Sequence, residues 1–331
     1  MNQSEIRNPK SKIFLGVDGG QSHTEAVVAD ENGFILGRGF GGASNHAEVP
    51  GGRERLQNAI TKSVGEALAK ANLPPIEEIV FTSSHFGMTG GADYKEETIS
   101  EIIKADHLIV GHDAPTALFG ATAGKSGIVV IAGTGSVVYG ENESGKIAKI
   151  GGLGYLFSDE GSGFWLAAQV IRLAIKEQDG LIARSGLEQL VLDYFGREVI
   201  REITNDFYNA KMSREDLAGF ARAACEAAAG GNVVIQEQIN FGAGVLVESV
   251  RSAAKRLNFR TAFSVAAVGG MFRGHLMKKY FSEALHKEVS GAMFTEPRFN
   301  PATGALLLAF RQAGIETNED LLQKLENSNI K

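Results

Sequence analysis

The sequence predicts an α/β protein of two domains that share one repeated arrangement of strands. Its 331 residues are typical of two domains rather than one or three. Apolar, β-branched runs alternate with helical patterns along the chain, which is the order of an α/β fold. Residues 13–37 and 127–150 also carry the same succession of strand, glycine turn, strand, hairpin turn and strand. This succession, the strand repeat, indicates an internal duplication with one copy in each domain.

The two copies of the strand repeat are recognised by their hairpin signals. In the first copy, residues Asp30 to Gly33 separate two alternating runs, and in the second copy residues Glu141 to Gly145 do the same. Asn-Gly and Ser-Gly pairs between alternating runs are strong hairpin signals. The strands expected on this basis begin at Ile13 and then cover 24–29 and 34–36 in the first copy, and 128–132, 137–140 and 146–150 in the second.

The rest of the chain completes two α/β domains. A helix is expected over about 53–72, because Leu56, Ile60, Val64 and Leu68 share one face. Further expected elements are strands at 78–82 and 107–110, a long helical region over 163–257, a buried strand at 263–268 with a helix to about 286, a helix over 301–313 and a partly helical tail. We predict an N-terminal domain of residues 11–121, joined by the C-terminal helix at about 301–331, and a C-terminal domain of residues 122–300, with the boundary near 121–126.

Composition excludes several classes of protein. The net charge is −6 with both signs interspersed, which argues against a nucleic-acid footprint. No apolar run approaches the roughly 18 to 20 residues of a membrane helix, and residues 1–12 lack a signal core. One cysteine, Cys225, cannot form an internal disulfide or hold an iron–sulfur cluster within one chain. We expect a cytoplasmic protein without nucleic-acid or membrane partners.

The first glycine motif spans residues 16–22. A glycine-rich turn between strands leaves backbone N–H groups free to face phosphate oxygens. Asp18 at the strand end is suited to holding Mg²⁺ through water, and Ser22 to donating to a phosphate. The alternative is an ordinary hairpin with a turn aspartate. The motif is neither a P-loop nor a Rossmann fingerprint, because the Lys-Ser/Thr pair is missing and a strand follows.

The second glycine motif, residues 131–136, occupies the same place in the second strand repeat. Thr134 and Ser136 are its candidate hydroxyl donors. Two such turns on separate domains would grip one triphosphate between them. Gly269 and Gly270 follow the buried strand 263–268, where glycine lets an adenine ring approach the backbone; the alternative is a tight strand-to-helix turn.

Asp113 is the candidate general base. It follows a predicted strand and stands where a helix begins, so it can accept a proton from a sugar hydroxyl as phosphorus is attacked. The alternative is a helix cap, with Pro115 in the first turn, and both roles can coexist. His112 is expected to be packed or solvated rather than a metal ligand.

A carboxylate and glycine loop at residues 151–165 is the candidate sugar site. Ser162 is expected to cap the following helix, and the helix dipole would suit Asp159 and Glu160. Capping does not explain the glycine density or the carboxylate pair, whereas a polyol-binding loop explains both.

These motifs together resemble the N-acetylglucosamine kinase family. That family lies within the BadF/BadG/BcrA/BcrD-type ATPases of the actin/Hsp70/hexokinase superfamily. The resemblance covers nearly the whole chain in order, and its most specific part is the run from Asp159 to Trp165 after the glycines at 151–154. It also includes the Asp18 turn, residues 44–46, Asp113 and the second glycine motif.

The resemblance implies two actin-like (ribonuclease H-like) domains with a nucleotide and sugar cleft between them. It implies an ATP- and Mg²⁺-dependent kinase that phosphorylates the 6-hydroxyl of N-acetylglucosamine or glucosamine, and a homodimer. By resemblance, the catalytic base is Asp113. The nucleotide-binding residues are Asp18, Gly19, Gly20, Ser22, Gly133, Thr134, Gly135, Ser136, Ala218, Gly269 and Gly270. The sugar-binding residues are Asn45, Asp113, Gly152, Leu153, Gly154 and Asp159.

Two departures and three alternatives stay open. Leu153 stands where mammalian relatives carry tryptophan, and the first turn reads Gly-Gly-Gln-Ser rather than Gly-Gly-Gly-Thr. The alternatives are a broad-specificity hexokinase or N-acetylmuramic acid kinase, a non-catalytic regulator that binds sugar and ATP, and an activator ATPase. The last of these would need cysteines for an iron–sulfur cluster, usually two per subunit, and the chain has one.

Overall fold

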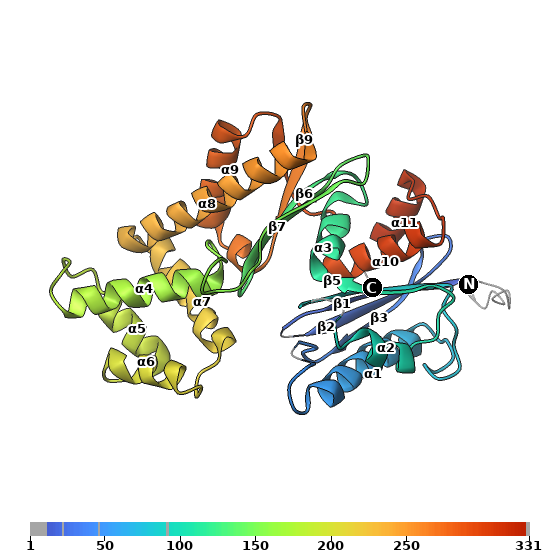
Figure 1. The fold of residues 1–331 in the computed structure, drawn as a ribbon, viewed down its shortest axis with the longest axis horizontal. Coiled ribbons are helices and arrows are strands. Elements are labelled where there is room, and N and C mark those ends of the chain that lie inside the picture. The colour runs from blue at the N-terminus through green and yellow to red at the C-terminus, as the bar shows by residue number, and fades with distance from the viewer. Residues whose placement is uncertain (1–11, 22, 46, 91–92, 329–331) are drawn as a thin grey trace, which may run out of the picture. The chain divides into compact units, whose positions relative to one another are not determined.

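The structure, a computed structural model, describes residues 12–21, 23–45, 47–90 and 93–328 (Figure 1). The chain divides into two compact units. The first unit comprises residues 1–125 and 297–331, and the second comprises residues 126–296. Each unit is built on one five-stranded sheet. The predicted α/β class with two similar sheets is therefore confirmed.

The two sheets have the same strand order and the same strand directions. In the first unit the order is β3-β2-β1-β4-β5, formed by Ile13–Gly19 (β1), Thr24–Asp30 (β2), Ile35–Gly41 (β3), Ser83–Met88 (β4) and Leu108–His112 (β5). In the second the order is β8-β7-β6-β9-β10, formed by Gly127–Ala132 (β6), Ser136–Glu141 (β7), Ile147–Gly151 (β8), Phe263–Val268 (β9) and Ala292–Thr295 (β10). In both, the first three strands in sequence are antiparallel and the last two run parallel to the first. The duplication inferred from the strand repeat is confirmed.

Helices cover both faces of the first sheet (Figure 1). They are Gly52–Lys70 (α1), Glu96–Ile102 (α2), Asp113–Thr122 (α3), Pro301–Gln312 (α10) and Glu319–Ser328 (α11). Successive residues of β1 point to opposite faces. Leu15 packs with Leu56 in the cluster beneath α1, whereas Phe14 packs against Phe310 of α10, with ring centroids 4.8 Å apart. Burial on both faces explains why β1 is a continuous apolar run.

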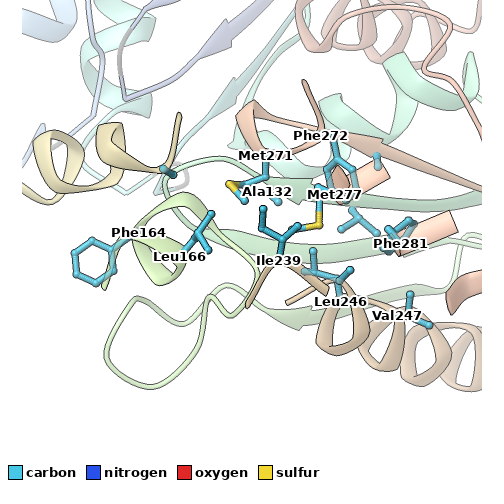
Figure 2. Packing of buried hydrophobic residues seen from close by; sticks show 14 of the residues in the cluster. Ala132, Phe164, Leu166, Ile239, Leu246, Val247, Met271, Phe272, Met277 and Phe281 are labelled. Carbon is cyan, nitrogen blue, oxygen red and sulfur yellow. The ribbon is translucent and has the colours of Figure 1, made fainter. Parts of the chain in front are cut away.

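One hydrophobic core joins the sheet and helices of the second unit. The helices are Gly163–Gln178 (α4), Leu187–Phe195 (α5), Ile200–Tyr208 (α6), Arg214–Ala229 (α7), Val233–Leu257 (α8) and His275–Glu288 (α9), with a 3₁₀ turn at Gly270–Arg273 (η1). Figure 2 shows Ile239 and Leu246 of α8 with Met277 of α9 and Ala132 of β6 in this core. None of the helices within the described ranges is both long and apolar enough to cross a membrane.

The predicted strand at 78–82 is wrong, because the strand is β4, at Ser83–Met88. Phe81 makes only an isolated bridge with Ala105. The error has a physical cause. The apolar, β-branched run precedes β4, whereas β4 itself holds buried Ser83, Ser84 and a glycine, Gly87, against which the side chain of Thr116 packs. A central strand crowded on both faces selects small residues over the usual strand formers. Helix α2 and strand β10 were also missed.

Helices α3 and α10 cross in backbone contact. A Cβ on Gly304 would lie 1.9 Å from the carbonyl oxygen of Thr116 and 2.4 Å from the backbone nitrogen of Gly120. The N–H of Phe299, just before α10, also donates to the carbonyl of Gly120 at 2.9 Å. This contact fixes α3, and with it Asp113, the first residue of α3.

We expect Gly304→Ala to lower the free energy of unfolding by about 1–3 kcal/mol, because the added methyl group overlaps backbone that cannot move without separating α3 from α10. The matched control is Gly65→Ala in α1, where a Cβ would meet nothing within 4 Å. That change should stabilise the protein by up to about 1 kcal/mol through helix propensity. Urea unfolding followed by circular dichroism compares the two. Equal midpoints for Gly304→Ala and the parent would contradict the packing argument.

Candidate active site

Acidic and hydroxyl side chains meet at the carboxyl ends of three neighbouring strands of the first sheet. Asp18 of β1 lies opposite Gly87 of β4, which lies opposite Gly111 of β5. Two residues further along, Thr89 follows β4 and Asp113 follows β5. Because parallel strands end at the same edge, Asp18, Thr89 and Asp113 occupy one edge, the acidic edge, where open α/β sheets bind ligands.

Asp113 is held by a hydroxyl rather than used as a helix cap. The cap position of α3 is His112, and it makes no side-chain cap hydrogen bond. The Thr89 hydroxyl donates to Asp113 Oδ2 at 2.8 Å. The Thr116 hydroxyl donates to the Asp113 carbonyl at 2.7 Å. The alternative that Asp113 serves as the cap is therefore wrong, and its carboxylate is oriented from the neighbouring strand end.

The carboxyl group of Asp18 is in an unfavourable place for a negative charge. Burial, together with the negative charges of Asp113 and Glu25, raises the pKa of Asp18 to about 8. The hydrogen bond from Thr116 acts in the opposite direction, but it is long, at 3.5 Å. A cation beside Asp18 would favour its ionised form.

The loop carrying Asn45 is tied to the turn after β1. The N–H of Ser44 donates to the carbonyl of Gly20 at 3.2 Å, which places the half-buried Asn45 beside the first glycine turn. A Cβ on Gly19 would lie 2.6 Å from the Ser44 hydroxyl, so the approach of the two loops requires glycine. Ser22, the predicted hydroxyl donor of this turn, lies outside the described residues.

In the second unit, the turn after β6 rests on the start of α4. The N–H groups of Gly163 and Phe164 donate to the carbonyls of Gly133 and Thr134 at 2.8 and 3.2 Å. The buried Ser136 hydroxyl donates inward to the Glu160 carbonyl at 2.8 Å. Of the two hydroxyls predicted to face phosphate, the half-buried one of Thr134 is thus the more accessible.

The remaining predicted nucleotide residues gather around the same turn. Gly269 has φ +105°, and a Cβ there would lie 2.3 Å from the carbonyl oxygen of Ala132, so only glycine allows β9 to end beside β6. A Cβ on Gly163 would lie 3.2 Å from the carbonyl oxygen of Gly133 and 3.4 Å from that of Ala218. The structure thus brings together Gly133, Thr134, Gly135, Ser136, Ala218, Gly269 and Gly270.

Asp159 joins the glycine loop at residues 151–158 to the turn after β6. It is 5% exposed and has a left-handed φ of +69°. A Cβ on Gly135 would lie 2.6 Å from Asp159 Oδ2. Burial raises the pKa of its carboxyl group, although the positive charge of Arg214 and the backbone N–H groups of Ser136 and Gly154 act in the opposite direction. Among the described residues, Asp159 Oδ1 has no hydrogen-bond partner, so this buried acceptor is available to a ligand hydroxyl.

The loop before Asp159 presents an apolar surface to solvent. Leu153 is 78% exposed and Phe157 is 88% exposed, whereas Tyr155 packs on Phe164 with ring centroids 4.7 Å apart. Positive φ angles shape this loop at Gly151, Gly152 and Gly154. An exposed apolar surface beside a buried acceptor suits a sugar ring, which offers C–H faces and hydroxyl edges. The predicted cap is confirmed, since the Trp165 N–H donates to the Ser162 hydroxyl at 3.2 Å.

Cys225 is a poor candidate for metal or redox chemistry. It is half-buried in α7, and burial, with the nearby charge of Glu226, raises the pKa of its thiol to about 11. A thiol of this kind is inert near neutral pH. Across the part of the chain that the structure describes, no group of three or more His, Cys, Asp or Glu side chains could hold a metal ion.

Sequence reasoning missed Thr89, Thr116 and Lys95 at the acidic edge. The available signal was positional, because Thr89 directly follows a strand that pairs with the strands ending at Asp18 and Asp113. Misplacing β4 by five residues hid that signal. The contact between Asp159 and Gly135 was also missed, because the two residues lie far apart along the chain.

Comparisons with known proteins agree with this geometry. Residues 15–309 match the model of the BadF/BadG/BcrA/BcrD ATPase family. The N-acetylmuramic acid/N-acetylglucosamine kinase of Clostridium acetobutylicum is 27% identical over 306 residues, which cover 90% of this chain and 98% of that protein. The N-acetyl-D-glucosamine kinase of Dictyostelium discoideum is 26% identical over 313 residues, which cover 90% of this chain and 98% of that protein.

A solved structure is also similar over nearly the full length. The crystal structure of a candidate N-acetylglucosamine kinase from Chromobacterium violaceum is 25% identical, with a TM-score of 0.74, and the match covers 90% of this chain and 99% of that chain. The family match spans most of the chain, including both glycine turns and the acidic edge. The chain therefore belongs to the BadF/BadG/BcrA/BcrD ATPase family, as its sequence motifs predicted.

Proposed function

We propose that this protein is an ATP-dependent kinase that phosphorylates an amino sugar, N-acetylglucosamine or glucosamine, at the 6-hydroxyl. The observation that carries the proposal is Asp113, whose carboxylate is held by Thr89 at the same sheet edge as Asp18. Full-length relatives named as amino-sugar kinases support this class of substrate. N-acetylmuramic acid and other hexoses are the alternative substrates.

Asp113 would act as the general base. It would accept the proton of the sugar hydroxyl while the oxygen attacks phosphorus. Asn45 and Asp159 would each hold sugar hydroxyls. Asp159 Oδ1, which has no hydrogen-bond partner among the described residues, supports its assignment, because a donor from the sugar would satisfy a buried acceptor. Gly152, Leu153 and Gly154 would contact the ring.

The glycine turns would bind the nucleotide. Backbone N–H groups at Gly19 and Gly135 would face phosphate oxygens, with the hydroxyl of Thr134 as a further donor. The N–H groups of Gly20 and Gly133 donate to the carbonyls of His23 and Gly135, both at 2.9 Å, so these two would have to leave those carbonyls to bind phosphate. Gly269, Gly270 and Ala218 would lie along the adenosine. The predicted contribution of Ser136 would require its hydroxyl to leave the Glu160 carbonyl, and Ser22 completes the predicted set.

Asp18 fits a magnesium ion held through water. Its raised pKa and the charges of Asp113 and Glu25 make a cation favourable at the acidic edge. When bound, Mg²⁺ would neutralise charge on the β- and γ-phosphates. Asp18 itself would hold and orient the hydrated ion, consistent with the preference of Mg²⁺ for carboxylate and water oxygens.

We expect Asp113→Asn to reduce kcat by about 10² to 10⁴-fold, because the amide cannot accept the proton. ATP binding should stay close to that of the parent. Asp106→Asn is the matched control, because Asp106 is exposed and precedes the amino end of β5. Steady-state kinetics of ADP release with saturating sugar measures the effect. Retention of most of the parental kcat would remove Asp113 from the role of base.

Asp18 should make stability of the ligand-free protein depend on pH. Its pKa rises from 3.8 to about 8 on folding, so its stabilising contribution is complete below about pH 4 and is lost as the pH rises through about 8. Asp18→Asn should remove this loss and be more stable than the parent at about pH 9. Denaturant unfolding at several pH values, with Asp106→Asn as the charge-matched control, measures the difference. If Asp18→Asn retains the parental fall in stability, the electrostatic assignment is wrong.

A panel of sugars tests the proposed substrate class and separates a kinase from a non-catalytic regulator. ADP release, measured with N-acetylglucosamine, glucosamine, N-acetylmuramic acid, glucose and mannose, should be sugar-dependent and should stop with excess chelator. We expect use of more than N-acetylglucosamine alone, because Leu153 offers a smaller surface than tryptophan and no ring donor. Apolar packing of this kind discriminates by only about 1–3 kcal/mol. Leu153→Trp should narrow the range, and the absence of turnover with every sugar would favour the regulator.

A further inference from the structure

Thr89 uses its three polar groups to connect three parts of the acidic edge. Its N–H donates to the carbonyl of Gly19, the last residue of β1, at 2.9 Å. Its hydroxyl donates to Asp113 Oδ2 at 2.8 Å, at the start of α3. Its carbonyl accepts from Lys95 Nζ, at the start of α2. Both backbone groups are engaged, so the hydroxyl is presented from a fixed point.

Lys95, which holds the backbone carbonyl of Thr89, is an unusual residue for this position. The residue is only 3% exposed, and burial lowers the pKa of its ammonium group, while the negative charges of Glu48 and Asp113 act in the opposite direction. Lysine is rarely buried to this extent unless it is paired. Here its ammonium holds the backbone of Thr89 and contributes a positive charge near Asp113.

The arrangement selects one oxygen of Asp113 for chemistry. Oδ2 accepts from Thr89, whereas within the described ranges Oδ1 makes no hydrogen bond. Asp18 and Lys95 are the charged groups that face this carboxylate, and Thr116 binds only the backbone carbonyl of Asp113. Without the Thr89 donor, nothing described at this edge would fix the rotation of the carboxylate. The base would then sample orientations that do not point at a substrate hydroxyl.

We propose that Thr89 is a positioning residue for the phosphoryl-transfer reaction, with its hydroxyl holding Asp113 and its backbone tying the base to the first glycine turn. The inference rests on the proposed function, since it assumes that Asp113 is the base. Thr89 lies outside the sequence motifs. Its backbone bond to Gly19 would link the orientation of the base to the strand that carries Asp18.

The test compares Thr89→Val, which loses the hydroxyl at nearly constant shape, with Thr89→Ser, which keeps it. We expect Thr89→Val to lower kcat by about 10- to 100-fold, with the KM for ATP unchanged, because misorientation of a catalytic group has costs of this size. Thr89→Ser should stay within about threefold of the parent, since it retains the charge-assisted bond. Thr122→Val is the control, because it removes a hydroxyl from α3, the helix that begins at Asp113, and that hydroxyl donates to the carbonyls of Leu118 and Lys125.

A double-mutant cycle shows whether Thr89 acts through Asp113. In the Asp113→Asn background, Thr89→Val should cause no further loss of kcat, since the group that it orients is already gone. Additive losses, an unimpaired Thr89→Val, or a Thr89→Ser as impaired as Thr89→Val would each overturn the inference. If circular dichroism shows that Thr89→Val does not fold, Thr89→Ala replaces it in the cycle. That variant removes the same hydroxyl without adding a methyl group.

The two proposals fail in distinguishable ways. An inactive Asp113→Asn with a fully active Thr89→Val would leave Asp113 as the base and remove only the positioning role. An active Asp113→Asn would remove the base and the positioning role together, and the sugar panel would then decide separately whether the protein is a kinase.

Discussion

The concentration of negative charge at the carboxyl edge of the first sheet is the constraint on which the rest of this site depends. Parallel pairing of β1, β4 and β5 leaves Asp18 and Asp113 at one edge, where each ionised carboxylate opposes the other. Glu25 adds to the charge, although Arg38 neutralises it at 2.6 Å. A buried lysine, Lys95, and the hydroxyl groups of Thr89 and Thr116 lie at this edge beside the carboxylates. Removing carboxylates from such a place would ordinarily stabilise a protein, so their presence is informative about function.

Glycine residues allow the close contacts at this edge and at the turn after β6 in the second unit. Gly304 lets α3 and α10 touch through their backbones, which fixes Asp113 from behind. Gly135 lets the carboxylate of Asp159 lie against the turn after β6, and Gly269 lets β9 end beside that turn. In each case the space that a Cβ would fill is taken by backbone or by the carboxylate of Asp159. These three glycines therefore allow close contacts between elements.

The sequence predicted those features that depend on local patterns. The duplicated strand repeat, the helix over residues 53–72 and the Ser162 cap all follow from residue patterns within single helices and hairpins, and the structure contains each of them. Features that depend on contacts between separate elements were not accessible. Strand β4 reads as polar because its composition is set by crowding from Thr116 on α3, and no local pattern reports that crowding. The pairing of Asp159 with Gly135 and the bridge from Thr89 to Asp113 are tertiary in the same sense. The motifs named Asp113 and Asp159 as candidates, but they did not indicate the residues that contact them.

The buried charged groups of the acidic edge indicate whether it serves ligand binding alone or also chemistry. A protein that only senses sugar and nucleotide needs donors and acceptors for hydroxyls and phosphates, which neutral side chains and backbone supply without the desolvation of charged groups. This edge instead keeps Asp18 and Lys95 in places where burial opposes their charged forms. It also fixes one oxygen of Asp113 while leaving the other without a partner among the described residues. A free, oriented carboxylate oxygen has little value for affinity, since it offers one acceptor near other negative charges. For proton removal from a hydroxyl that attacks phosphorus, it is the group that the reaction requires. The cost in stability is thus better explained by phosphoryl transfer than by recognition alone.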